Sequence, residues 1–253
     1  MLFDLLDDLR AEQADLRGLV ADADLVAPTP AAGWDVRDAV AHLAGSDEEA
    51  RKAATRPEAF VAGLAEVAKD IDGFLTGQLT ARRGLSRAQL LSDWQAGFDA
   101  MVEAFATVPP GTKVPWYGPP MSPTSFATAR LMEYWAHGQD VADALGVRRT
   151  PTDRLRHVCH LGVRTRGFAY ANRGLVAPDV PVAVHLTAPA GGEWSFGEGD
   201  QQVTGPAEDF CLLVTQRRHR DDLALRAEGD AAEEWLGVAQ CFAGPPGPGR
   251  DRR

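Results

Sequence analysis

Glu133 and His137 stand four residues apart in a segment with helical hydrophobic periodicity. Side chains at positions i and i+4 of a helix lie one above the other, so this carboxylate and imidazole have the spacing of metal ligands. His42 is the remaining histidine before residue 150. If His42 joins the pair, the three side chains form a catalytic type of metal centre, in which one coordination position stays open.

Spacing alone leaves several roles open for these residues and their neighbours. A glutamate and a histidine four residues apart on a helix are most often a solvated or hydrogen-bonded pair. Asp140, one turn beyond His137, is a candidate for orienting that imidazole, or for a cap or salt bridge within a bundle. Arg130 lies on the same helix, near the face that Glu133 and His137 share, and could steer a carboxylate substrate. An arginine at such a position is, however, more often a surface residue.

Long helices must position these residues. Apolar side chains recurring at three- and four-residue steps predict four long helices, from Leu2 to about Ala23, Val36 to about Thr55, about Ala88 to Thr107, and Pro123 to about Leu145. Asp35 is the expected N-cap of the second, with Asp38 at its third helical position. A more polar helix is expected from about Glu58 to Leu79. The first 148 residues are therefore predicted to form a helical bundle.

The predicted secondary structure changes from helices alone to a mixture of helices and strands after Thr150-Pro151. A helix from Asp153 to about Arg173 is followed by three predicted strands and two terminal helices, at Val180–Leu186, Gly192–Phe196, Gln201–Thr204, about Pro206–Arg217 and about Ala231–Phe242. The first two strands suggest a hairpin, and the helices are expected to pack on the sheet. His157, Cys159 and His160 lack a fourth partner at helical spacing, so we interpret them as plain helix surface rather than a second metal site.

Composition limits the classes of partner and compartment. The chain has 253 residues, with 26 Lys and Arg against 36 Asp and Glu and a net charge of −10, which argues against nucleic acid and anionic membranes as partners. The three cysteines form no CxxC pair, so neither a disulfide framework nor a thiolate zinc site is suggested. The acidic N-terminus does not resemble a signal peptide, and no apolar run is long enough to span a membrane. We expect a cytoplasmic protein, either a monomer or a homodimer.

Three motifs carry a family resemblance. GWDVRDAVAHL at residues 33–43, WYGPPMS at residues 116–122 and ARLMEYWAHGQD at residues 129–140 resemble the mycothiol-dependent maleylpyruvate isomerase family. This family is a branch of the DinB-like metal-binding four-helix bundles, and the resemblance is closest to an actinobacterial metal-binding subgroup. Carried over residue by residue, it implies that the zinc ligands are His42, Glu133 and His137. The family's catalytic arginine has no assigned position, because Arg82, Arg83 and Arg87 lie in a stretch that does not align.

The resemblance also implies a fold and a chemistry. The expected fold class is α+β, with a DinB-like four-helix bundle over residues 1–148, a small sterol-carrier-like α+β domain over residues 149–243 and a disordered tail over residues 244–253. The implied enzyme uses a divalent metal, zinc or another such as nickel, to activate the low-molecular-weight thiol mycothiol. The thiolate would be transferred to a small electrophilic substrate or would assist its isomerisation. A metal-dependent hydrolase and a non-catalytic metal-binding protein are the alternatives.

Overall fold

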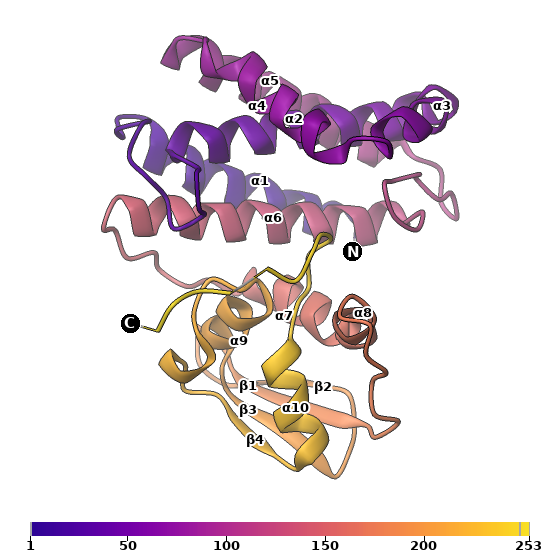
Figure 1. The fold of residues 1–253 in the computed structure, drawn as a ribbon, viewed down its shortest axis with the longest axis vertical. Coiled ribbons are helices and arrows are strands. Elements are labelled where there is room, and N and C mark those ends of the chain that lie inside the picture. The colour runs from indigo at the N-terminus through magenta and orange to yellow at the C-terminus, as the bar shows by residue number, and fades with distance from the viewer. Residues whose placement is uncertain (1, 248, 253) are drawn as a thin grey trace. The chain divides into compact units, whose positions relative to one another are not determined.

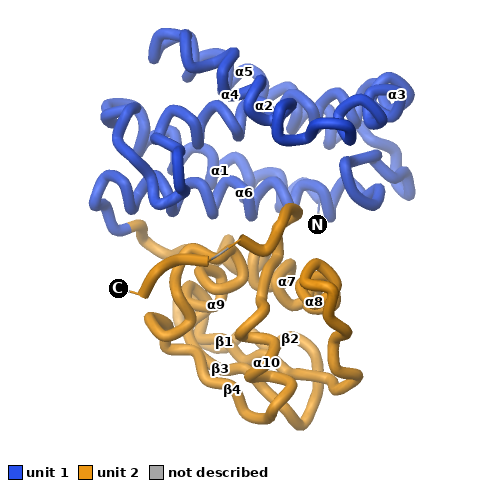
Figure 2. The backbone as a smooth tube through the Cα atoms, viewed as in Figure 1, with its two compact units in different colours: residues 1–148 blue, residues 149–253 orange. Residues whose placement is uncertain are grey.

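The computed structural model describes residues 2–247 and 249–252. The chain folds into two compact units, residues 1–148 and residues 149–253 (Figure 2). Helices dominate the first unit, and the second adds a four-stranded sheet, which confirms the predicted α+β class. The tail expected over residues 244–253 includes residues 248 and 253, which lie outside the described residues, so its disorder stays a prediction.

Four long helices build the first unit (Figure 1), namely α1 (Leu2–Val20), α2 (Val36–Thr55), α5 (Arg87–Thr107) and α6 (Pro123–Ala144). Each lies where its apolar periodicity predicted it. Helix α2 packs against α5 and α6, and α1 packs against α6. The apolar stripes meet in a core that contains Leu9, Leu43, Trp94 and Phe98, each at most 1% exposed. The two helices that carry the candidate ligands, α2 and α6, are therefore neighbours.

The start of α2 is held by the predicted cap. The Asp35 side chain accepts a hydrogen bond from the Asp38 amide at 2.8 Å, and the Asp38 carboxylate accepts one from the Asp35 amide at 3.4 Å, forming a capping box. Arg83 adds a bidentate pair to Asp38, with distances of 2.8 and 2.7 Å. These contacts anchor the helix two turns before His42.

One predicted helix of the first unit is wrong in its extent. In place of a single helix from Glu58 to Leu79, the structure has α3 (Pro57–Val67) and α4 (Ile71–Arg83). Asp70 separates them, because its side chain accepts a hydrogen bond from the Gly73 amide at 2.8 Å and so caps α4. A short carboxylate that binds local backbone amides favours a new helix start over continuation of the old helix.

The sheet of the second unit has the strand order β2-β1-β3-β4, made of β1 (Val182–Thr187), β2 (Glu193–Phe196), β3 (Gln201–Pro206) and β4 (Arg226–Glu228). Strands β1 and β2 pair antiparallel, as the predicted hairpin requires. Strand β3 pairs in parallel with β1 on its other side. Strand β4 was not predicted, because it is only three residues long and has no buried residue, so it carries no period-two pattern.

The helices of the second unit depart from prediction at one point. The helix expected from Asp153 to Arg173 is interrupted at Thr165, which separates α7 (Leu155–Arg164) from α8 (Arg166–Ala171). The Thr165 hydroxyl donates to the Leu161 carbonyl at 2.9 Å, and such back-bonding bends or ends helices. Helices α9 (Ala207–Val214) and α10 (Asp230–Val238) contact the sheet as predicted, and a short 3-10 turn spans Arg220–Asp222.

Across the described part of the chain, the helices are too short or too polar for any of them to cross a membrane.

Candidate metal centre

The three side chains predicted as ligands lie together. His42 on α2 places Nε2 3.6 Å from Oε2 of Glu133, and His137 places Nε2 3.4 Å from the same oxygen. One ligand atom from each residue lies within 4.8 Å of the other two. The side chains of His42, Glu133 and His137 are 19%, 24% and 10% exposed, so the cluster is largely buried yet reachable from solvent.

The distances from Glu133 to the two imidazoles suit ligands of one small divalent ion. Nitrogen and oxygen ligands bind zinc at about 2.0–2.2 Å, so two ligands of a tetrahedral site lie about 3.3 Å apart. The distances of 3.4 and 3.6 Å approach that value. Two imidazoles and one carboxylate are also the donor set of catalytic zinc sites. Within the described residues the group has three members, and three protein ligands leave a coordination position for a substrate.

Burial and neighbouring groups set the protonation states of two of the three donors, His42 and Glu133. Burial lowers the pKa of His42, and the nearby His137 lowers it further, against the opposing effect of Glu133. His42 is therefore neutral at pH 7 with a lone pair available. Burial by itself would raise the pKa of Glu133, but the contacts with His137 and His42 outweigh it and hold the pKa well below its ordinary value. Glu133 is therefore ionised.

Asp140 lies on the other side of the His137 ring from Glu133. Its Oδ2 is 3.5 Å from His137 Nδ1, whereas His137 Nε2 faces Glu133. The Asp140 side chain is 1% exposed. A buried carboxylate beside the distal nitrogen is the usual arrangement for fixing the tautomer of a metal-binding imidazole.

Arg130 is not a surface residue, so that interpretation was wrong. It is 3% exposed, and its Nε and Nη2 donate to Oδ1 of Asp47 at 3.2 and 2.9 Å. The Tyr134 hydroxyl donates to the other oxygen of Asp47, and Trp94 Nε1 donates to that hydroxyl at 2.7 Å. Burial and the Asp47 charge raise the pKa of Tyr134 well above its ordinary value, so the hydroxyl stays protonated.

Asp47 was not predicted as a residue of the site, although its position in the sequence carries a signal. Asp47 occupies a position in the apolar stripe of α2, whose other members are Val36, Val40, Leu43 and Ala50, all fully buried. A carboxylate at such a position requires a partner. The partner is Arg130 on α6, and this pair joins the two helices that carry the candidate ligands.

Each of the three unaligned arginines has a contact within the first unit. Arg82 pairs with Glu48 at 2.9 Å, Arg83 pairs with Asp38, and Arg87 donates to backbone carbonyls at the end of α1. Arg82 also lies close to Gly45, because a Cβ added there would be 3.4 Å from its Nη1. Gly45 is one turn beyond His42 and Asp38 is one turn before it, so Arg82 and Arg83 both have contacts next to the part of α2 that carries the candidate ligand.

The cluster of His157, Cys159 and His160 does not form a metal site in the described part of the chain. His160 is exposed as predicted, but Cys159 is fully buried and its Sγ lies 3.4 Å from that of Cys211. The surface interpretation is wrong for Cys159 because α7 packs against α9 on that side.

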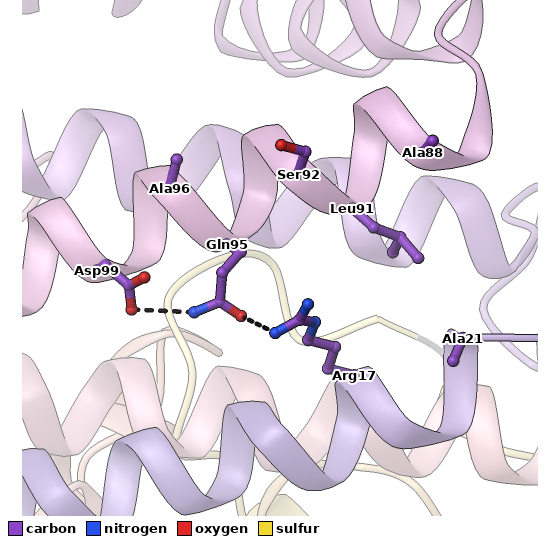
Figure 3. Close-up of a pocket in the computed structure, with 8 residues that line it drawn as sticks. All are labelled: Arg17, Ala21, Ala88, Leu91, Ser92, Gln95, Ala96 and Asp99. Carbon is purple, nitrogen blue, oxygen red and sulfur yellow. Dashed lines mark hydrogen bonds between the residues drawn. The ribbon is translucent and has the colours of Figure 1, made fainter.

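A cavity of about 520 Å³ lies elsewhere in the first unit, between α1 and α5 (Figure 3). Arg17 donates to Gln95 at 2.9 Å across it, and Gln95 donates to Asp99 at 2.9 Å. None of the three candidate ligands lines this cavity, and the polar groups that span it satisfy one another. It therefore adds nothing to the metal centre.

Comparison with known proteins identifies the family and the fold of the chain. The family model described as the mycothiol maleylpyruvate isomerase N-terminal domain matches residues 6–142. Uncharacterized proteins of Mycobacterium tuberculosis, from strains CDC 1551 and H37Rv, are 49% identical over 248 residues, which cover 96% of this chain and 96% of theirs. Crystal structures of the mycothiol-dependent maleylpyruvate isomerase and of a mutant of it match with a TM-score of 0.58 at 14% and 13% identity, over 92% of this chain and 96% of theirs.

Proposed function

The chain belongs to the mycothiol maleylpyruvate isomerase family, and from this premise we propose that His42, Glu133 and His137 bind a divalent metal ion that activates a low-molecular-weight thiol. Zinc is the first candidate, with nickel, iron and manganese as alternatives, and mycothiol is the proposed thiol. The observation that carries the proposal is the convergence of two imidazoles and one carboxylate, drawn from α2 and α6, with the two imidazole nitrogens 3.6 and 3.4 Å from one oxygen of Glu133.

The residues of the site define what each would contribute. A zinc ion bound by these residues would supply Lewis-acid chemistry and would lower the pKa of a coordinated thiol from about 8.5, so that the thiol would be deprotonated at neutral pH. Glu133 provides the negative charge that balances part of the ion's charge, and Asp140 holds the His137 ring with Nε2 turned toward the site. The partial exposure of His42 and Glu133 leaves an approach for the thiol and for its substrate.

Two outcomes follow from a thiolate held beside an electrophile, and we propose a transferase or isomerase of this kind. In a transfer, the sulfur bonds to the electrophilic carbon and a leaving group departs with the bonding electron pair. In an isomerisation, the sulfur adds to one carbon of a conjugated double bond, the resulting single bond rotates, and elimination of the thiolate restores the double bond. Neither route needs an oxidant or a reductant.

Loading the protein with Co²⁺ tests the proposal directly. Addition of mycothiol to the cobalt protein is expected to produce a sulfur-to-cobalt charge-transfer absorption, and mass spectrometry with candidate electrophiles is expected to detect the thiol adduct. A protein that takes up no divalent metal would contradict the proposed centre. A protein that binds cobalt, gives no such band with thiols and cleaves amides or thioesters would instead be the alternative hydrolase.

Replacing Asp140 by asparagine is expected to weaken metal binding about 10–100-fold, because the partner of His137 Nδ1 loses its charge. Chelator competition measures the affinity. The matched control is Asp143→Asn on the same helix, whose carboxylate accepts a hydrogen bond from Gln139 at 2.9 Å and lies outside the cluster. Equal effects of the two variants would rule out an orienting role for Asp140.

The pH dependence of metal affinity follows from the lowered pKa of His42. Because burial moves this pKa below its ordinary value of 6.5, His42 does not compete for protons near neutral pH. Proton competition at His42 is therefore expected to leave metal affinity unchanged between about pH 7 and pH 8 and to lower it only at pH values below 6.5. Chelator competition at a series of pH values measures this, and a steady fall from about pH 8 would contradict it.

Two further predictions accompany this function. We propose that the protein works in the cytoplasm, in keeping with its net charge of −10 and its three buried cysteines. We also propose that it acts as a monomer or homodimer on a small-molecule substrate, with no nucleic-acid or membrane partner.

A further inference from the structure

Trp34, in the loop before α2, lies against both candidate imidazole ligands. Its ring is stacked on that of His137, with centroids 5.6 Å apart and an angle of 11° between the planes. The same indole meets His42 at 5.2 Å and a tilt of 55°. The two imidazoles are themselves 4.8 Å apart. Trp34 therefore completes a cluster of three rings that spans α2 and α6.

The backbone of this loop holds Trp34 firmly in place. Both the amide and the hydroxyl of Thr29 donate to the Trp34 carbonyl at 2.9 Å, and the Trp34 amide donates to the Ala31 carbonyl at 3.0 Å. Gly33 takes a φ of +78°, which a glycine adopts without strain and which allows the tight turn. Asp35, the next residue, is the N-cap of α2. The indole is thus placed by a short, hydrogen-bonded turn.

The position of this side chain differs from that of an ordinary core tryptophan. Trp94 and Trp235 are at most 1% exposed, whereas Trp34 is half-buried and follows the exposed residues Ala32 and Gly33. Its large apolar surface covers two polar rings. Aromatic rings that pair in this way attract one another beyond the effect of their buried area, so rotation of the imidazole away from the indole is opposed.

We infer that Trp34 is a positioning residue of the metal centre, which holds the His137 ring in the plane that turns Nε2 toward the ion and closes one side of the site to water. The inference rests on the proposed function. Asp140 and Trp34 act on His137 in different ways, since the carboxylate lies near Nδ1 at 3.5 Å and the indole lies over the ring face. Together they restrain both the tautomer and the orientation of this ligand.

The test uses Co²⁺ as a probe of the full-length protein, because its visible spectrum reports coordination geometry. We compare Trp34→Leu, which keeps apolar bulk but removes the aromatic face, with Trp34→Phe, which keeps a ring. Trp116→Leu is the control, since Trp116 stacks on Phe60 at 5.7 Å and meets Phe126 at 4.6 Å, away from the ring cluster. Circular dichroism and thermal melting establish that each variant is folded.

Trp34→Leu is expected to release cobalt to a chelator about tenfold faster or more and to change the intensity of the visible bands as water enters the coordination sphere. Trp34→Phe is expected to lie between this variant and the wild type, and Trp116→Leu to match the wild type. If Trp34→Leu binds cobalt with unchanged bands and release rate, the inference is wrong while the metal centre stands. If the wild-type protein binds no cobalt, the metal centre itself is wrong.

Discussion

Replacing His42 by alanine is expected to abolish stoichiometric metal binding and leave the helical bundle folded. Metal sites with four ligands bind zinc with about 10–16 kcal/mol, so one ligand is worth about 3–4 kcal/mol, or roughly 10²–10³-fold in affinity. The His42 side chain is 19% exposed and lies outside the apolar stripe of α2, so its removal opens no large cavity in the core. Elemental analysis and a thermal melt of the same sample measure the two quantities.

The control for this variant is His160→Ala, since His160 is an exposed histidine on α7 and belongs to no metal cluster within the described residues. It is expected to keep the metal content of the wild type. Glu133→Gln keeps the shape of the carboxylate and removes its charge, so it should reproduce the loss seen with His42→Ala. Undiminished metal in both His42→Ala and Glu133→Gln would show that the metal, if present, is bound elsewhere.

Replacing Asp47 by alanine is expected to destabilise the protein by about 3–5 kcal/mol, because it leaves the Arg130 guanidinium buried without its counter-charge. Asp47 and Arg130 are 0% and 4% exposed, and the Tyr134 hydroxyl loses its acceptor in the same change. Denaturant unfolding measures the loss. Because the pair joins α2 to α6, metal affinity is expected to fall in the same variant even under conditions in which it is folded.

Two comparisons distinguish the stability loss of Asp47→Ala from a general sensitivity of the helical bundle to substitution. Asp47→Leu combined with Arg130→Met removes both charges and is expected to be more stable than Asp47→Ala, since no uncompensated charge remains. Glu66→Ala breaks the exposed pair of Glu66 and Lys69, which are 75% and 68% exposed, and should cost less than about 1 kcal/mol. A loss no larger for Asp47→Ala than for Glu66→Ala would contradict the structural role of the buried pair.

Local patterns in the sequence were sufficient for most of the helices and for the pair of Glu133 and His137, whereas the full set of candidate ligands with His42 was implied by the family resemblance. The four long helices follow from apolar periodicity, and the start of α2 follows from the Asp35 and Asp38 capping box. The pair of Glu133 and His137 could be predicted because both residues belong to one helix, in which side chains four residues apart lie on the same face. The hairpin of β1 and β2 is likewise a contact between neighbours in the chain.

Breaks within helices and short strands were harder to predict from the sequence. The break at Asp70 depends on whether a side chain caps the backbone, and the break at Thr165 depends on a hydroxyl hydrogen bond, so periodicity by itself joins each pair of helices into one. Strand β4 exists because β3 offers it an edge for antiparallel pairing. None of these features has a local signal strong enough to compete with the helical or loop pattern around it.

The sequence alone therefore determined which side chains share a helix face, and thereby the candidate ligand pair on α6 and the presence of His42 on α2. Only the tertiary structure decided that α2 turns His42 toward that pair, that Arg130 is buried against Asp47, and that Trp34 stacks on His137. The physical reason is that helical periodicity relates residues a few positions apart. The rotation and register of one helix against another depend on side-chain packing between segments about ninety residues apart, as His42 and Glu133 are.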